Sequence, residues 1–125
     1  MAADKVLVVD DEQHMLRLME YNLKEHGYEV VTVANGESAI KAAKVERPSL
    51  ILLDIKMPGM NGVEVYQALM ADASTRGIPI IVVSILADED KAKAIGARSY
   101  ILKPFSPDVL IREVEEVLGG GGANG

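Results

Sequence analysis

The stretch from Leu50 to Gly62 constrains the fold of this chain more than any other. It opens with Leu50–Leu53, four consecutive large aliphatic residues, as expected for a strand covered on both faces. Asp54 follows directly, and Pro58-Gly59 then turns the backbone away. Open parallel sheets bind ligands at the carboxyl ends of their strands, so we expect Asp54 to be the chemical centre. Taken alone, Asp54 also fits a turn or helix-capping residue, so its assignment depends on the rest of the chain.

Short apolar runs alternate with amphipathic segments of about a dozen residues, a pattern typical of repeated strand-helix-strand units. Strands are predicted over Lys5–Val9, Glu29–Val33, Leu50–Asp54, Ile80–Ser84 and Ser99–Leu102. Val, Ile and Leu dominate all of them except the last, which favours parallel strands buried on both faces. We therefore predict an α/β fold, with a doubly wound five-stranded parallel sheet and helices on both faces.

Helices are predicted between the strands, where apolar residues recur at helical spacing. The predicted segments are Glu12–Glu25, Gly36–Val45, Gly62–Ala71, Asp88–Ile95 and a last helix that begins at Ser106-Pro107. Their expected buried residues, in chain order, are Leu16, Met19 and Leu23, then Ala39, Ile40 and Ala43, then Val63, Tyr66 and Met70, and finally Leu110, Val114 and Val117. Gly27 is expected to end the first helix in the left-handed conformation.

Polar side chains occur at the ends of four predicted strands. They are Asp10 and Asp11 after the first strand, Asp54 at the end of the third, Ser84 at the end of the fourth and Lys103 after the fifth. Because the carboxyl ends of parallel strands meet at one edge, these side chains should be neighbours. Each alone fits a helix cap, a turn cap or a solvated surface charge, but their shared position indicates a site.

Three carboxylates at one edge require a counter-ion, because charges within about 4 to 6 Å repel by several kcal/mol at an effective dielectric of roughly 20. Oxygen ligands without His or Cys favour a hard cation, and a site that keeps water molecules suits Mg²⁺. Beside a metal ion, an ammonium and a hydroxyl, Asp54 has the surroundings of a nucleophile that forms an aspartyl phosphate.

This set of residues resembles the receiver domains of bacterial two-component response regulators, over residues 4 to 118. The motifs that carry the resemblance are Asp10-Asp11, the segment Asp-Ile-Lys-Met-Pro-Gly-Met-Asn-Gly from Asp54 to Gly62, Ser84, Gly96-Ala97, Tyr100 and Lys103-Pro104-Phe105. The resemblance implies a flavodoxin-like strand order 2-1-3-4-5. It also implies a signalling switch that is not an enzyme in the usual sense, since it would catalyse only its own phosphoryl transfer and aspartyl-phosphate hydrolysis.

The same resemblance implies a phosphoacceptor site. Asp54 would receive a phosphoryl group from a sensor histidine kinase or a phosphotransfer protein. Asp10, Asp11, Asp54 and the backbone carbonyl of Lys56 would bind Mg²⁺, the expected cofactor.

A switch is implied as well. Ser84 would receive a phosphoryl oxygen, and Lys103 would pair with the phosphoryl group and precede a cis bond to Pro104. Ser84 and Tyr100 would change the output face, which a downstream protein target or an output domain removed from this chain would read.

Two departures from the family pattern affect the surroundings of the site. Between Ser84 and Gly96 the chain is about three residues shorter than is usual in the family, close to one helical turn. Ile85 occupies a position where the family usually has a small residue. We expect Ile85 to crowd the phosphoryl pocket, and the short fourth helix to weaken dimerisation, which predicts a monomer before phosphorylation.

Composition narrows the partners. A formal net charge of -6 argues against direct binding of nucleic acid, which depends on Lys and Arg at phosphates. The absence of cysteine excludes disulfides and thiolate chemistry. The apolar run Val6–Val9 is too short for a signal or membrane segment, so we expect no membrane partner and a cytoplasmic location. Residues 1–118 are expected to form the receiver domain, and residues 119–125 a flexible Gly-rich tail.

Three alternatives stay open on the sequence. A flavodoxin-like cofactor carrier would need a hydroxyl- and glycine-rich loop after the first strand, where Asp10-Asp11-Glu12 would repel phosphate. A magnesium-dependent phosphatase of small molecules would need a second acid for the leaving group, but Lys56 lies two residues after Asp54. The third is a phosphorylation-independent protein-interaction module of the same fold.

Overall fold

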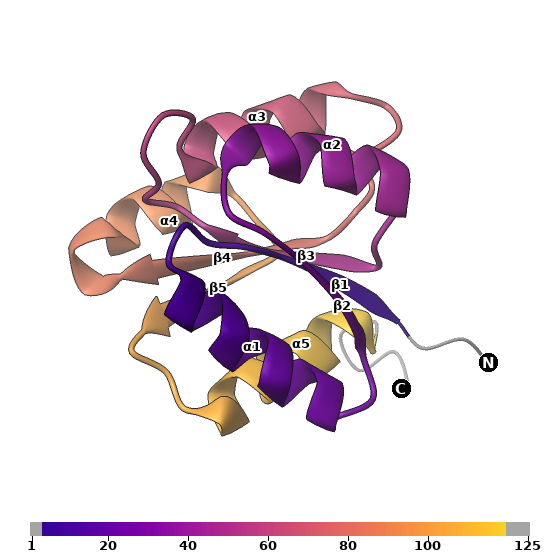
Figure 1. The fold of residues 1–125 in the computed structure, drawn as a ribbon. Helices are drawn as coiled ribbons and strands as arrows, with labels where there is room; N and C mark the ends of the chain where they lie inside the picture. Colours follow the sequence, from indigo (N-terminus) through magenta and orange to yellow (C-terminus); the bar gives the residue numbers. More distant parts are fainter. Residues whose placement is uncertain (1–3, 120–125) are drawn as a thin grey trace.

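The computed structural model describes residues 4–119, and it confirms the α/β fold and the strand order. In this part of the chain, five parallel strands form one sheet in the order β2-β1-β3-β4-β5 (Figure 1). The strands are β1 (Lys5–Val9), β2 (Glu29–Val33), β3 (Leu50–Asp54), β4 (Ile80–Ile85) and β5 (Ser99–Lys103). Except for Gly119, the predicted tail lies outside the described residues.

Within residues 4–119, five α-helices and one short 3-10 helix, η1, connect and cover the strands. They are α1 (Gln13–Glu25), α2 (Gly36–Glu46), α3 (Gly62–Ala71), η1 (Leu86–Asp88), α4 (Glu89–Ile95) and α5 (Pro107–Leu118). Helices α1 and α5 cover one face of the sheet, whereas α2 and α3 lie on the other (Figure 1). None of the helices in this part of the chain combines the length and hydrophobicity needed to cross a lipid bilayer.

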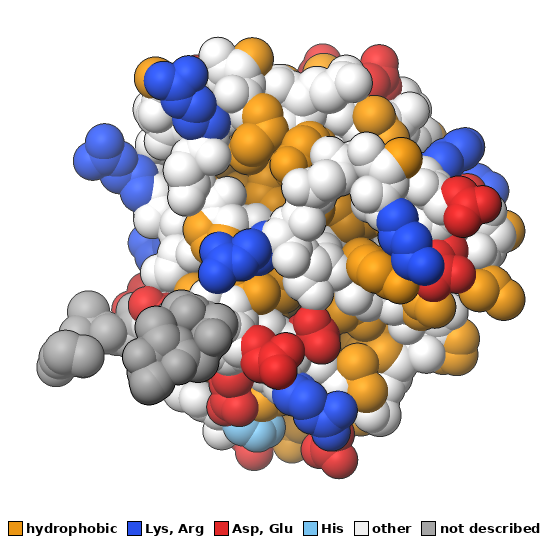
Figure 2. Space-filling view, turned by 180° about the vertical axis from the view of Figure 1, so that it is seen from behind, with side chains coloured by type: hydrophobic (Ala, Val, Ile, Leu, Met, Phe, Trp, Pro, Cys, Tyr) orange, Lys and Arg blue, Asp and Glu red, His pale blue; other side chains and the backbone are white. Residues whose placement is uncertain are grey.

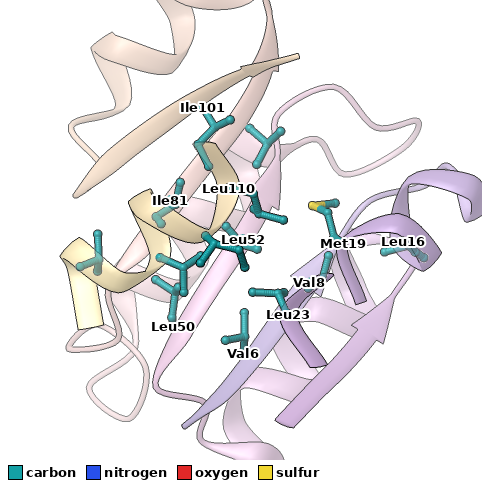
Figure 3. Close-up of a cluster of buried hydrophobic side chains, with 14 residues drawn as sticks. Val6, Val8, Leu16, Met19, Leu23, Leu50, Leu52, Ile81, Ile101 and Leu110 are labelled. Carbon is teal, nitrogen blue, oxygen red and sulfur yellow. The ribbon is translucent and has the colours of Figure 1, made fainter. Parts of the chain in front are cut away.

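A hydrophobic core fills each side of the sheet. On the side of α1 and α5, side chains from both helices meet those of the three central strands and β5 (Figure 3). The residues predicted to be buried on these two helices are buried, namely Leu16, Met19, Leu23, Leu110, Val114 and Val117. On α2, Ala39 and Ala43 are buried as predicted, while Ile40 is only partly buried.

The predicted buried face of α3 is wrong by one residue. Val65 and Leu69 are buried, whereas Val63, Tyr66 and Met70 are only partly buried. The helix begins with Gly62 packed against the end of β3, and Val65 and Leu69 lie three and seven residues further on, along the same stripe. This contact with β3 therefore fixes the rotation of α3.

The remaining boundaries agree with the predictions to within about two residues, the usual uncertainty of helix and strand ends. Strand β4 includes Ile85, and α4 begins at Glu89 because η1 precedes it. Gly27 ends α1 with a φ of 89°, and the side chain of Ser106 caps α5, as predicted.

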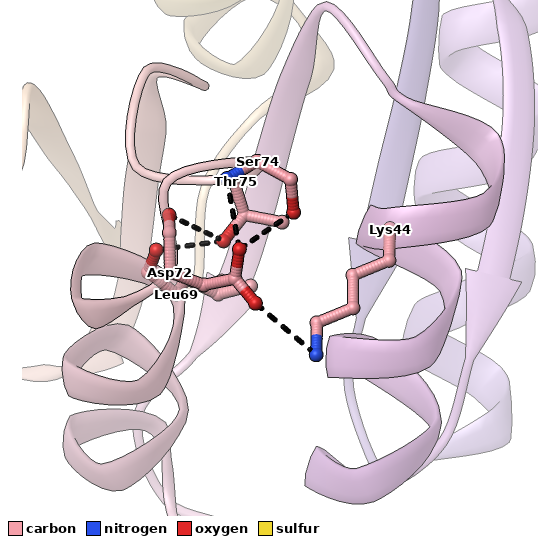
Figure 4. A network of polar contacts seen from close by, with 5 residues as sticks. All are labelled: Lys44, Leu69, Asp72, Ser74 and Thr75. Carbon is pink, nitrogen blue, oxygen red and sulfur yellow. Dashed lines mark hydrogen bonds and ion pairs between the residues drawn. The ribbon is translucent and has the colours of Figure 1, made fainter.

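A polar network closes the connection between α3 and β4 (Figure 4). One carboxylate oxygen of Asp72 accepts hydrogen bonds from the backbone N–H of Ser74 at 2.8 Å and its hydroxyl at 2.7 Å, while the other pairs with Lys44 of α2 at 3.2 Å. These interactions lower the pKa of Asp72 to about 2. The buried hydroxyl of Thr75 donates to the carbonyl of Leu69 at 2.7 Å, which satisfies a backbone acceptor at the end of α3.

Replacing Thr75 by valine should lower the free energy of unfolding by about 1 to 2 kcal/mol. The substitution keeps the shape of the side chain but leaves the buried carbonyl of Leu69 without this donor. Urea denaturation would measure the change. Thr32→Val is the matched control, because Thr32 is partly exposed on β2 and its hydroxyl has no hydrogen bond within residues 4–119. Equal effects of the two substitutions would contradict the assignment.

Candidate functional site

Three carboxylates converge at the carboxyl edge of the sheet. Asp10 and Asp11 follow β1 directly, and Asp54 is the last residue of the neighbouring strand β3. Asp10 and Asp54 are buried, Asp54 with 5% of its surface exposed, whereas Asp11 is exposed. One carboxylate oxygen from each residue lies within 4.8 Å of the other two. The structure thus brings these predicted residues together.

Lys103 reaches this acidic cluster from the end of β5. Its ammonium nitrogen lies 2.8 Å from Asp10 Oδ2 and 3.4 Å from Asp54 Oδ1, and 14% of its side chain is exposed. Asp10 is held from a second direction, since its Oδ1 accepts a hydrogen bond from the backbone of Glu12 at 2.9 Å. The bond between Lys103 and Pro104 is cis, as the family resemblance implies. One long side chain therefore links β5 to the ends of β1 and β3.

The carboxyl group of Asp54 ionises less readily than an ordinary aspartate. Burial is the main cause and the charge of Asp10 is the second, and together they raise the pKa of Asp54 to about 6. Lys103 and the backbone of Lys56 oppose the shift. Burial alone would lower the pKa of Lys103, but its contacts with Asp10 and Asp54 raise it above the usual value. The site therefore has an excess of negative charge that Lys103 only partly compensates.

Ser84 lies beside the acidic cluster with an unused hydroxyl. It follows Val83, the residue of β4 that pairs with Asp54 of β3. Only 1% of Ser84 is exposed, and its Oγ has no hydrogen-bond partner among residues 4–119. Buried polar groups without a partner are rare in native proteins, and they call for an explanation such as a bound group. The serine is placed to supply a donor at this edge of the sheet.

Gly62 fixes the loop that follows Asp54. Its N–H donates to the carbonyl of Ile55 at 2.9 Å. A Cβ atom at this position would overlap the backbone carbonyl of Asp54 and the Cα of Ile55, and backbone atoms cannot move aside cheaply. Only glycine lets the start of α3 approach the end of β3 this closely. The turn between them, which contains Lys56, is held in place by this contact.

Three other residues singled out in the sequence lie around the cluster. Lys56 is exposed two residues beyond Asp54. Ile85 is 42% exposed, at the end of β4 next to Ser84. Tyr100, the second residue of β5, is partly buried and pairs with Val82, and its hydroxyl is directed to α4 and not to the acidic cluster.

Two residues around Tyr100 were not predicted from the sequence. The hydroxyl of Tyr100 donates to Glu89 Oε2 at 3.1 Å, and the ammonium of Lys93 lies 5.5 Å from the centre of the tyrosine ring. Lys93 also pairs with Glu89 at 3.5 Å. The spacing of four residues between Glu89 and Lys93 indicates a salt bridge on one helix face. It does not indicate that Tyr100 joins the pair.

The donor set of the cluster defines its chemistry. Three carboxylates with no histidine or cysteine match the ligands that hard divalent cations prefer. Burial and the neighbouring charge of Asp10 raise the pKa of Asp54, and such a cation would stabilise its ionised form. Asp54 also presents a carboxylate oxygen next to the Lys103 ammonium, which is the pairing of nucleophile and positive charge that phosphoryl transfer uses.

The fold and the site together define a class, the flavodoxin-like α/β domains with an acidic site at the carboxyl edge of the sheet. Within that class the match is specific, because residues 6–115 match the family model described as "Response regulator receiver domain". The chain therefore belongs to the receiver domains of two-component response regulators, which confirms the family resemblance.

Curated relatives fall into two groups by length. The alkaline phosphatase synthesis transcriptional regulatory protein PhoP of Bacillus subtilis is 39% identical over 91% of this chain, and the chain spans 48% of PhoP. Protein PilH of Pseudomonas aeruginosa is 36% identical over 93% of this chain, and the chain spans 98% of PilH. The chain thus spans about half of the first relative and nearly the whole of the second.

Solved structures show the same fold. Chemotaxis protein CheY4 of Vibrio cholerae is 32% identical, with a TM-score of 0.84 over 93% of this chain and 99% of CheY4. The receiver domain of sensor histidine kinase PA1611 of Pseudomonas aeruginosa is 29% identical, with a TM-score of 0.88 over 94% of this chain and 99% of that domain. Its structure is described with a magnesium ion coordinated in the active site cleft.

Asp54→Asn should stabilise the metal-free protein at pH 7.5 and have little effect near pH 4. The folded-state pKa of Asp54, about 6, lies above the unfolded value of about 3.9, so the folded wild type loses stability as the pH rises through this window. The asparagine variant does not ionise and so does not lose this stability, and its free energy of unfolding at pH 7.5 should exceed that of the wild type by on the order of 1 to 3 kcal/mol.

Urea denaturation in a chelator across this pH range would measure the difference. The matched control is Asp108→Asn, because Asp108 is exposed on α5. A gain in stability of the same size at every pH would show that the ionisation of Asp54 is not its cause.

Proposed function

We propose that the protein is a phosphorylation-activated signalling switch, in which Asp54 receives the phosphoryl group. The observation that carries this proposal is the meeting of Asp10, Asp54 and Lys103 beside the unpartnered hydroxyl of Ser84. Nucleophile, positive charge and hydrogen-bond donor are present at one edge of the sheet. The donor would be a sensor histidine kinase or a phosphotransfer protein.

The proposed reaction moves one phosphoryl group. An oxygen of Asp54 attacks the phosphorus of a phosphohistidine, the P–N bond breaks, and its electron pair returns to the imidazole nitrogen. Asp54 then carries an acyl phosphate, which Lys103 stabilises through its positive charge and Ser84 through a hydrogen bond. Later attack by water breaks the bond between phosphorus and Asp54 and releases inorganic phosphate. The protein thus acts only on its own phosphoryl group and on no other substrate.

Mg²⁺ is the proposed cofactor, and the donor set fits it. Asp10, Asp11 and Asp54 would hold the ion together with the backbone carbonyl of Lys56. When bound, the ion neutralises charge on the carboxylates and on the phosphoryl oxygens. The magnesium described in the PA1611 receiver domain supports this assignment.

The output would be a change in the surface around Ser84 and Tyr100. The lengths of the relatives suggest two ways in which this surface could be recognised. In a protein about as long as PilH, a separate downstream protein would bind it, and in a protein about twice as long, an output domain of the same chain would contact it. Lysines and arginines are interspersed with acidic residues on the face shown in Figure 2, and the net charge of the chain is -6. This charge distribution supports a protein as the partner, and it does not favour direct contact with nucleic acid or a membrane. We expect a cytoplasmic monomer before phosphorylation.

A phosphorylation-independent interaction module of the same fold is the alternative. Such a module would not need the hydroxyl of Ser84 to be buried without a partner, nor a carboxylate with a raised pKa beside a lysine. These features are unfavourable in the free protein. In a phosphoryl switch, the Ser84 hydroxyl would donate to the phosphoryl group and the carboxylate beside Lys103 would accept it.

Treatment with acetyl phosphate and Mg²⁺ should add the mass of one phosphoryl group to the intact protein. Asp54→Asn should stay unmodified, because its amide is not a nucleophile. Asp108→Asn is the control and should be modified like the wild type. Intact-mass spectrometry of the three proteins measures the result. An unmodified wild type, or a modified Asp54→Asn variant, would contradict the proposed function.

Mg²⁺ should raise the melting temperature of the wild type, because binding to the folded state alone stabilises it. The expected gain is about 2.7 kcal/mol at a metal concentration of a hundred times the dissociation constant. Asp11→Asn should weaken the response, since Asp11 is exposed and its loss removes one ligand without opening the core. Asp108→Asn should respond like the wild type. Melting curves with metal and with chelator that coincide would rule out a cation site at the cluster.

A further inference from the structure

We propose that Glu89 is a positioning residue of the switch, which holds Tyr100 in the arrangement of the unphosphorylated protein and connects it to Ser84. This inference rests on the proposed function and extends it to a residue outside the acidic cluster. The connection runs through the start of α4, which lies between β4 and β5 in the chain.

The first observation is that Glu89 Oε2 is shared by two partners. It accepts a hydrogen bond from the hydroxyl of Tyr100 at 3.1 Å and pairs with the ammonium of Lys93 at 3.5 Å. The ammonium of Lys93 also lies over the ring of Tyr100, 5.5 Å from its centre, in a cation–π contact. Hydrogen bonding by Tyr100, followed by the charge of Glu89, raises the pKa of Lys93 above its usual value. The three side chains therefore stabilise one another in a single arrangement.

The second observation is the short path from Ser84 to Glu89. Only the last residue of β4 and the three residues of η1 separate them. The backbone N–H of Glu89 donates to the carbonyl of Leu86, so η1 continues directly into α4. This connection has no long flexible segment that could absorb a movement of Ser84. A shift of the serine toward a phosphoryl oxygen would therefore displace the first turn of α4, together with the carboxylate of Glu89.

The sheet register places the two switch residues on neighbouring strands. Tyr100 of β5 pairs with Val82 of β4, and Ser84 lies two residues further along β4. The strands are linked by their ladder, while the first turn of α4, which bears Glu89, continues directly from the end of β4 through η1. Movement of that helix relative to β5 would lengthen the bond between Glu89 and Tyr100. The bond therefore belongs to the free state and opposes phosphorylation.

The size of the effect follows from the type of bond. A hydrogen bond to a charged group stabilises more than one between neutral groups when it is sheltered, and it stabilises less when it is partly exposed, as here. Because the bond between Tyr100 and Glu89 is present only in the unphosphorylated state, it favours that state in the equilibrium by the free energy of the bond. We expect its removal to speed phosphorylation by about 3- to 10-fold, less than a fully sheltered bond of this type would give.

A double-mutant cycle tests the proposal. Glu89→Ala removes the acceptor, Tyr100→Phe removes the donor and keeps the ring, and the double variant removes both. Each single substitution should raise the rate of phosphorylation by acetyl phosphate at saturating Mg²⁺, and the double variant should be no faster than the faster single variant. Glu89→Gln, whose amide oxygen can still accept, should lie between the wild type and Glu89→Ala.

The matched control lies on the other side of β5. Ser99 donates to Glu113 of α5 at 2.6 Å, which is also a bond from a β5 hydroxyl to a helix glutamate, but α5 follows β5 and is not connected directly to Ser84 at the end of β4. Ser99→Ala and Glu113→Ala should leave the rate unchanged. Asp90→Ala tests whether loss of any exposed charge on α4 is sufficient, and it too should match the wild type.

A second readout needs no phosphorylation. The NMR signals of the Tyr100 ring in the free protein should shift and broaden in Glu89→Ala but not in Glu113→Ala. A wild type that takes up no phosphoryl group would refute the proposed function, and ring signals would still test the contact. If the wild type is phosphorylated at the same rate as Glu89→Ala, the role of Glu89 is overturned while the proposed function stands. The same holds if the rate increases caused by Glu89→Ala and Tyr100→Phe multiply in the double variant.

Discussion

The contact of Lys103 with Asp10 and Asp54 is the interaction on which the site depends. Two buried carboxylates side by side repel strongly in a low-dielectric environment, and burial raises the pKa of Asp54. Lys103 lies within 3.4 Å of both and compensates part of this charge. Because the lysine comes from β5 and the aspartates from β1 and β3, the pairing also requires the strand order of this sheet. The charges and the topology are therefore one constraint.

The rest of the fold keeps that edge in register. Both cores are apolar, and they bury the central strands on the two faces of the sheet (Figure 3). Gly62 then brings α3 against the end of β3 and limits how far the loop after Asp54 can move. Packing thus provides rigidity on both sides of Asp54. Among the buried side-chain nitrogen and oxygen atoms of residues 4–119, those without a hydrogen-bond partner are Ser84 Oγ and Asp88 Oδ2, on β4 and just after it.

Much of this arrangement could be predicted because parallel sheets obey a simple rule. Once the strands were recognised, their carboxyl ends had to meet, and this placed Asp10, Asp54 and Lys103 together without knowledge of any contact. The prediction of which α3 residues are buried is wrong by one residue. Hydrophobic spacing along the helix allows two neighbouring stripes of buried residues, and only the contact of Gly62 with β3 selects one. Glu89 was missed for a related reason, since its contact with Tyr100 depends on how α4 packs against β5.

Under the proposed function, the free protein balances unfavourable and favourable groups. Asp54 has a raised pKa and Ser84 lacks a hydrogen-bond partner, and a cation with a phosphoryl group would relieve both. Tyr100 and Glu89, by contrast, are satisfied before any phosphoryl group arrives. The first pair favours the phosphorylated state and the second opposes it. Because η1 and Ile85 are all that separates Ser84 from Glu89, one cannot move far without the other, so the difference between these two contributions sets how completely phosphorylation shifts the switch.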